Sequence, residues 1–149
     1  MEIIVIGPNP PCIRCSTTAK RAKRVAERIL GNQMHFRYIL LPDPAAEQYG
    51  KVACGREIEE IGNVRPDFDH MHRLLHQLDL LESDQESNAA EIDRLLRELD
   101  EVLTPVRAKA EELGYLMTPV LLINGLAKSA GYVPSEADIE RWVSHEIAS

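Results

Sequence analysis

Residues 3–15 read Ile3-Ile4-Val5-Ile6-Gly7-Pro8-Asn9-Pro10-Pro11-Cys12-Ile13-Arg14-Cys15, and this stretch joins an apolar run to a pair of cysteines. Four consecutive β-branched residues are typical of a strand that is buried on both faces of a sheet. The glycine and prolines that follow favour a turn, so the strand should end there. We therefore expect the two cysteines to lie where a first strand passes into a helix.

An amphipathic helix is predicted directly after this turn. From Cys12 to Leu30 the apolar residues recur three and four positions apart, and Gly31 is a typical helix stop. A second apolar run at residues 36–41 predicts another strand, which Pro42 ends. The first 41 residues thus predict a βαβ unit with parallel strands and a right-handed crossover.

The last third of the chain predicts a helix and a further buried strand. Residues 104–113 continue a helical pattern that stops at Gly114. The dipeptide Thr118-Pro119 then precedes a short apolar run at residues 120–123. This run should form a third strand of the same sheet.

A hairpin and a final helix should complete the chain. Asn124-Gly125 is a strong hairpin signal, because a type I′ turn needs a positive φ at both of its central positions. Residues 126–130 should then return antiparallel to the preceding strand. Ser135, followed by an acid three residues later, resembles a capping box that opens the last helix.

The middle of the chain differs in charge and in period. Residues 42–103 carry 16 acidic and 6 basic residues, whereas the whole chain of 149 residues has a net charge of only −7. Leucines at helical spacing predict a helical hairpin here, preceded by a shorter helix at about residues 46–61. We infer an α/β core of residues 1–41 and 104–149, and an inserted acidic helical subdomain of residues 42–103. The insert should fold against a basic helix or present an acidic face to a partner.

Composition excludes several classes of protein. No apolar run approaches the roughly 20 residues that a membrane-spanning helix needs, and the acidic start of the chain is unlike a signal peptide. These features favour a cytoplasmic protein without membrane association. Net acidity argues against nucleic acid as the main partner. The odd count of three cysteines excludes a fully paired disulfide framework and any site that needs four thiolates.

Cys12 and Cys15 form the pattern that can carry chemistry. A cysteine at a helix N-terminus meets unsatisfied N–H groups and the positive end of the helix dipole, which favour its thiolate. Cys15 lies one turn further in, close enough to form a disulfide. Arg14 adds positive charge between them. We therefore predict Cys12 as the nucleophile and Cys15 as the resolving thiol.

The order of these elements, with the cysteine pair at the first strand–helix junction and Thr118-Pro119 before the third strand, resembles the thioredoxin-like superfamily. This resemblance implies an α/β, thioredoxin-like fold, with a βαβ–αββα core and an α-helical insertion. The insertion lies where periplasmic disulfide oxidoreductases of the superfamily carry a helical domain, so the likeness there is topological. The resemblance also implies that Pro119 is cis and faces the cysteine pair.

The same resemblance implies a thiol-disulfide oxidoreductase or redox carrier. Its redox group would be the Cys12–Cys15 dithiol-disulfide couple, with no other cofactor. Its partners would be a protein disulfide or dithiol and an unidentified electron donor. The expected partner-binding residues lie around the pair: Ile13, Arg14, Met117, Thr118 and Pro119.

Two alternatives stay open at the level of sequence. The chain could be a non-catalytic protein-interaction or metal-binding module. In that case Cys12, Cys15, His72 and His76 could be ligands, with His70 nearby in sequence.

Two further features have no assigned role in the sequence. Cys54 is either a small buried residue or a relay thiol for the pair. The leucine-rich insert could pack on the core or form a homodimer.

Overall fold

The computed structural model describes residues 1–148, which form an α/β protein around a four-stranded mixed sheet. Strand β1 (Glu2–Gly7) lies at its centre, parallel to β2 (His35–Leu40) and antiparallel to β5 (Val120–Ile123). Strand β6 (Leu126–Ala130) pairs antiparallel with β5, which gives the order β2-β1-β5-β6. The predicted βαβ unit and the predicted hairpin are both confirmed.

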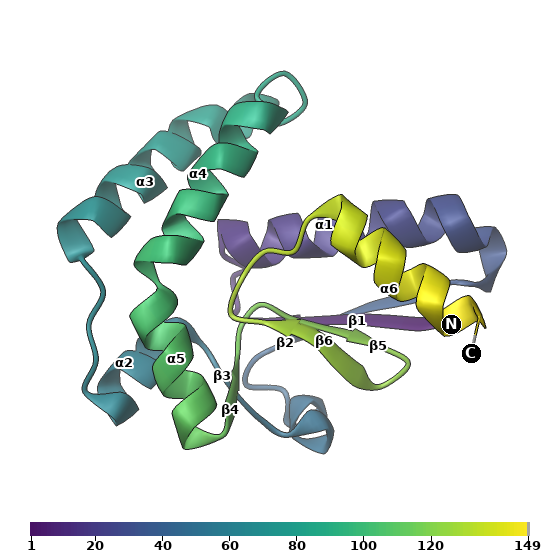
Figure 1. Ribbon diagram of the computed structural model, residues 1–149, viewed down its shortest axis with the longest axis horizontal. Coiled ribbons are helices and arrows are strands. Elements are labelled where there is room, and N and C mark those ends of the chain that lie inside the picture. The colour runs from purple at the N-terminus through teal and green to yellow at the C-terminus, as the bar shows by residue number, and fades with distance from the viewer. Residues whose placement is uncertain (149) are drawn as a thin grey trace.

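Different elements pack on the two faces of this sheet. Helices α1 (Ile13–Leu30) and α6 (Glu136–Ala148) lie side by side on one face (Figure 1). Successive side chains of a strand point to opposite faces, so β1 buries Ile3 and Val5 under these helices. The other face packs against a short 3₁₀-helix, η2 (Pro44–Tyr49). Both faces are apolar, as the unbroken apolar run of β1 predicts.

The helical part of the chain forms its own apolar cluster. Helices α3 (Phe68–Leu81) and α4 (Ala89–Val102) pack together, which confirms the predicted helical hairpin (Figure 1). Helix α5 (Thr104–Leu113) follows α4 after a single residue and joins the same cluster. The buried residues contributed by these three helices are Leu74, Leu78, Ile92, Leu95, Leu96, Leu99, Val106 and Ala110. Within residues 1–148, no helix has both the length and the apolar character that crossing a membrane requires.

The helix expected at residues 46–61 is wrong as a single element. Gly50 has a φ of 129°, which no helix accommodates, and it separates η2 from strand β3 (Lys51–Ala53). Strand β3 pairs parallel with β4 (Tyr115–Met117) in a second, two-stranded sheet. Helix α2 (Gly55–Gly62) follows and contacts α5. The middle segment is therefore tied to the last third of the chain by strand pairing and by helix packing.

The turn and the helix cap that the sequence predicts near the C-terminus are both present. Asn124 and Gly125 have φ values of 50° and 80°, the left-handed values that a type I′ turn requires. The Ser135 hydroxyl accepts a hydrogen bond of 3.1 Å from the backbone N–H of Asp138, which caps α6. The sequence alone thus fixes where β5 ends and where the last helix begins.

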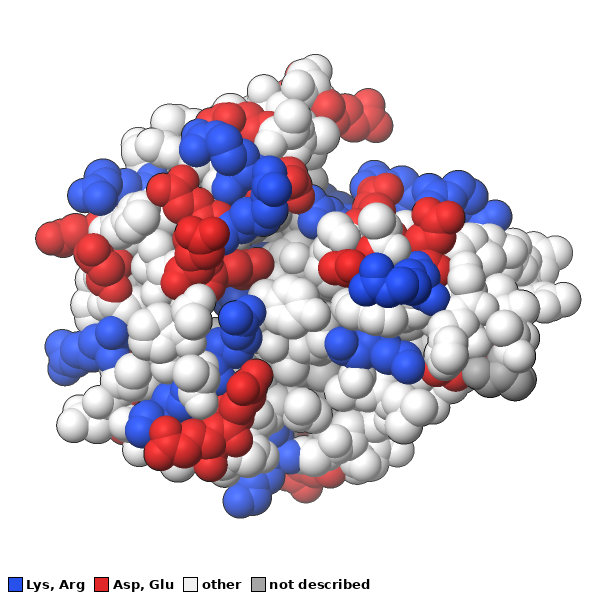
Figure 2. Space-filling view, in the orientation of Figure 1, with Lys and Arg blue, Asp and Glu red and all other residues white. Residues whose placement is uncertain are grey.

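The opposite charges of the core and of the middle segment meet in part inside the molecule. Arg21 of α1 pairs with Asp93 of α4 at 2.9 Å, and Arg14 of α1 pairs with Asp100 of α4 at 3.0 Å. In Figure 2, basic and acidic side chains are interspersed over the visible face. The acidic segment therefore folds partly against the basic helix of its own chain.

Candidate active site

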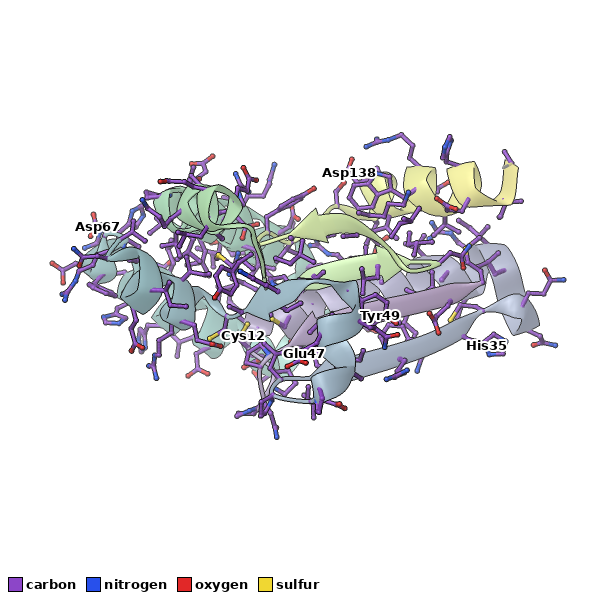
Figure 3. The ribbon with its side chains drawn as sticks, turned by 90° about the horizontal axis from the view of Figure 1, so that it is seen from below. Cys12, His35, Glu47, Tyr49, Asp67 and Asp138 are labelled. Atoms are coloured by element: carbon purple, nitrogen blue, oxygen red, sulfur yellow. The ribbon has the colours of Figure 1, made fainter. Side chains whose placement is uncertain are left out.

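Cys12 is the residue that caps α1. Its Sγ accepts a hydrogen bond of 3.4 Å from the backbone N–H of Cys15, in the position that an N-cap side chain usually occupies. Cys12 is exposed and Cys15 is completely buried. Figure 3 shows Cys12 where the sheet and the helical part of the molecule meet. A partner can therefore reach the first thiol but not the second.

The two sulfurs form an asymmetric pair. They lie 3.2 Å apart, within hydrogen-bond distance and close enough to form a disulfide after a small rotation. The hydrogen bond from the Cys15 thiol is the main reason why the pKa of Cys12 falls to about 6, and the Cys15 N–H and the Arg14 charge add to it while burial opposes them. The same hydrogen bond, burial and the Cys12 charge raise the pKa of Cys15. At neutral pH, Cys12 is thus mainly a thiolate and Cys15 a thiol.

Arg14, between the two cysteines, points into the protein. Its Nε donates to Asp100 Oδ1 at 3.0 Å, and its guanidinium also donates to the carbonyl oxygen of Gly131. The second oxygen of Asp100 accepts from the N–H of Val133 at 3.0 Å. Burial raises the pKa of Asp100, and the Arg14 charge opposes that rise. Because the guanidinium is used inside the protein, contact of Arg14 with a partner would have to come from its backbone.

The peptide bond between Thr118 and Pro119 is cis, and it lies directly before β5. Pairing of Ile6 with Val120 places Pro119 next to the end of β1, where the chain leaves for Cys12. The carbonyl oxygen of Pro119 accepts from the N–H of Gly131 at 3.1 Å, and Gly131 in turn binds Arg14. Gly131 therefore links Pro119 to Arg14, the residue next to the buried Cys15.

The backbone of Thr118 is already engaged within the chain. Its N–H donates to the carbonyl oxygen of Ala53 at 3.0 Å, which extends the pairing of β3 with β4. Met117 is buried in the helical cluster, and Ile13 is half-buried against that cluster. Of the residues expected to bind a partner, Ile13 is thus more accessible than Met117 or Thr118.

A groove that sequence reasoning missed runs alongside Cys12. It encloses about 430 Å³ between the residues on either side of Cys12 and helix α3. Four apolar and three polar residues line it: Pro11, Ile13, Leu75, Leu78, His76, Asp79 and Glu82. The helical spacing of the leucines on α3 predicted burial, but nothing local indicated that the α1 N-terminus would lie opposite them.

The ligands of the metal-binding alternative are not brought together. Within residues 1–148, no three His, Cys, Asp or Glu side chains are placed so that they could hold a metal ion. His72 lines a separate hollow with Arg56, whereas His76 lies in the groove beside Cys12. His70 contacts Glu98 at 3.0 Å.

Cys54 caps helix α2, directly after β3. It is half-buried, and burial raises its pKa. A neutral thiol is a poor nucleophile, so Cys54 should react much more slowly than Cys12. Its role as a relay thiol stays a prediction.

The fold and the site define an α/β protein with a Cys-x-x-Cys pair at the N-terminus of a helix, next to a cis proline. No family model, no curated protein and no solved structure matches the chain. The geometry of the site is therefore the basis for a proposal about function.

Proposed function

We propose that this protein is a thiol-disulfide oxidoreductase or redox carrier with a thioredoxin-like core, which exchanges electrons with a disulfide of a partner protein. The observation that carries this proposal is the asymmetry of the pair. An exposed, low-pKa thiol lies 3.2 Å from a buried, high-pKa thiol. Such a pair separates attack on a partner from resolution of the product.

The reaction has two balanced steps. The Cys12 thiolate attacks one sulfur of the partner disulfide, and the other partner sulfur leaves as a thiolate that takes up a proton. Cys15 then loses its proton and attacks Cys12, which releases the second partner sulfur and leaves a Cys12–Cys15 disulfide. Two electrons pass from the pair to the partner, and an electron donor with its own dithiol must return them. The same steps in reverse would oxidise a partner.

The position of the cis proline supports a thioredoxin-like core. Pro119 directly precedes β5, next to the C-terminal end of β1 from which the chain continues to Cys12, as the resemblance implies. The engaged N–H of Thr118 is a departure from that expectation. A partner strand could therefore pair with the Thr118 backbone only if β3 were displaced. Otherwise it would have to bind another part of the loop.

The direct test is reduction of a protein disulfide such as those of insulin, with dithiothreitol as the electron donor. Catalysis should depend on Cys12. Trypsin cuts after Arg14, so after one turnover the two tryptic peptides that carry Cys12 and Cys15 should be joined by a disulfide and should together weigh two hydrogens less than the separate reduced peptides. A chain that reduces no protein disulfide and contains zinc at stoichiometry would instead support the metal-binding module.

The pKa of Cys12 gives a prediction for pH dependence. We expect the rate of alkylation of Cys12 by iodoacetamide to be half-maximal near pH 6, because only the thiolate reacts. Mass spectrometry of trapped peptides would give this rate separately for each cysteine. In the Cys15→Ala variant the midpoint should move upward, since the main hydrogen bond to the Cys12 thiolate is lost. A midpoint above pH 8 in the unaltered chain would contradict the assignment of Cys12 as nucleophile.

The groove beside Cys12 gives a prediction for partner choice. Its lining of apolar and acidic side chains fits an extended protein segment that carries an apolar and a basic side chain next to its disulfide. Leu75→Glu should slow reduction of such a protein disulfide by about tenfold, the effect of losing about 1.4 kcal/mol of binding. Reduction of a small aromatic disulfide should not change. Leu80→Glu is the matched control, because Leu80 lies on α3, is 67% exposed and does not line the groove. Equal effects of the two substitutions would contradict partner binding in the groove.

A further inference from the structure

The side chains of Tyr38 and Cys15 both approach Gly7, where β1 ends and the turn to Cys12 begins. Gly7 lies on the face of β1 that points to α1, and Tyr38 of β2 packs on that same face. A Cβ atom at Gly7 would collide with the Tyr38 hydroxyl and would lie only 3.0 Å from Cys15 Sγ. The hydroxyl and the buried sulfur are therefore neighbours above Gly7, where no side chain other than hydrogen fits.

Within residues 1–148 the buried Tyr38 hydroxyl makes no hydrogen bond of ordinary geometry, and the group close enough to act on it as a hydrogen-bond partner is the Cys15 thiol. A buried hydroxyl without a partner is unfavourable, so such a group needs an explanation. In the reduced form Cys12 is mainly a thiolate, so the Cys15 thiol is the donor of the 3.2 Å hydrogen bond between them, and the Cys15 sulfur carries no charge that would attract a donor. The hydroxyl thus lies in contact with a sulfur that acquires charge only later in the reaction.

That charge develops in the resolving step. Once Cys12 is bonded to a partner, it no longer carries a charge and no longer accepts a hydrogen bond from Cys15. The Cys15 thiol must then ionise while it is completely buried. The only cation among the groups that act on Cys15 is Arg14, and Arg14 is already paired with Asp100. The remaining group that acts on Cys15 and can donate a hydrogen bond to its thiolate is the Tyr38 hydroxyl.

We propose that Tyr38 is a positioning residue, whose hydroxyl donates a hydrogen bond to the Cys15 sulfur as it ionises and so accelerates resolution of the mixed disulfide. This proposal rests on the proposed function. The Cys15 proton passes to water, the Cys15 electron pair forms the bond to Cys12, and the partner sulfur leaves with the electron pair of its former bond to Cys12. Tyr38 keeps its own proton throughout. Burial, and the charges of Cys15 and Cys12, raise the pKa of Tyr38, so it remains a donor at every pH at which the reaction runs.

The test uses the aromatic disulfide dithiobis(nitrobenzoate) to follow the two steps separately. The chain carries Cys54→Ala, so that only Cys12 and Cys15 can react. Attack by Cys12 on this reagent releases one thionitrobenzoate and leaves a mixed disulfide on Cys12. Attack by Cys15 releases the second thionitrobenzoate, and a stopped-flow spectrometer resolves the two phases. The first phase can also be measured alone in the Cys15→Ser background.

Tyr38→Phe should slow the second phase roughly ten- to a hundredfold, the effect of losing a hydrogen bond to a charged group. The first phase should not change, and the pH midpoint of the second phase should move upward. Tyr49→Phe is the matched control, because Tyr49 packs on the opposite face of the sheet and should leave both phases unchanged. An unchanged rate and midpoint of the second phase in Tyr38→Phe would overturn the proposal.

A second variant covers the case in which Tyr38→Phe does not fold. Replacement of Tyr38 by 3-fluorotyrosine keeps the ring and makes the hydroxyl a stronger donor, so the midpoint of the second phase should move downward. No shift would again overturn the proposal. If the unaltered pair releases only one thionitrobenzoate, the proposed function fails. If it releases both but neither Tyr38 variant alters the second phase, only the role of Tyr38 fails.

Discussion

Replacing Cys15 with serine should stop turnover at the mixed disulfide, whereas replacing Cys12 with serine should abolish reaction from the start. Cys12 is the exposed thiolate and Cys15 is completely buried, so only Cys12 can meet a partner. In Cys15→Ser, a covalent complex with the protein disulfide should accumulate and should be visible on a non-reducing gel. Reduction of the protein disulfide should fall to the uncatalysed rate in both variants. Without Cys12 the disulfide is not attacked, and without Cys15 the mixed disulfide is not resolved.

The control for this experiment is Cys54→Ser, which should turn over at the normal rate. Cys54 has a raised pKa and caps α2 rather than α1. If the covalent complex in Cys15→Ser disappears when Cys54 is also removed, the partner is held by Cys54, and Cys12 is not the nucleophile. Turnover by Cys15→Ser at the normal rate would show that Cys15 does not resolve the mixed disulfide.

Replacing Asp100 with alanine should destabilise the protein by about 3–5 kcal/mol, because it leaves the Arg14 guanidinium buried without its partner. Asp100 also accepts from the N–H of Val133, and this group would lose its partner as well. Urea denaturation followed by circular dichroism would measure the loss. Replacing both partners, as in Arg14→Met with Asp100→Leu, should recover much of it, since no charge is then buried alone.

Asp93→Ala is the matched control on the same helix. Asp93 pairs with Arg21 at 2.9 Å, but its side chain is 37% exposed, so water screens the pair and replaces the lost contact. Loss of the Arg21–Asp93 pair should lower the free energy of unfolding by about 0–1 kcal/mol. Equal losses for Asp93→Ala and Asp100→Ala would mean that the Arg14–Asp100 pair does not hold the helical part to the site.

Local sequence signals predict most of the elements because they depend on neighbours in the chain. The apolar run of β1, the glycine stop of α1 and the Asn124-Gly125 turn each act within a few residues. Strands β3 and β4 were missed because each has three residues, too few for a periodic pattern, and each exists only through pairing with the other.

The site was predictable only where it depends on position along the chain. The location of Cys12 and Cys15 at a helix N-terminus follows from the turn and from the helical period. The partner of Arg14 could not be found in this way, because Asp100 lies 86 residues further along and its selection depends on how α4 packs. Tyr38 was hidden for a similar reason, since a tyrosine in a strand is ordinarily a packing residue.

The tight space above Gly7 has a consequence for how sequences with this site can diverge. A side chain at position 7 would require the hydroxyl at position 38 and the sulfur at position 15 to move apart. A Cβ atom at position 7 would also lie 2.9 Å from Cys15 Cβ, so loss of the hydroxyl at position 38 alone would not make room for a methyl group. Glycine should therefore persist at position 7 in chains that keep Cys15, whether or not they keep the hydroxyl at position 38.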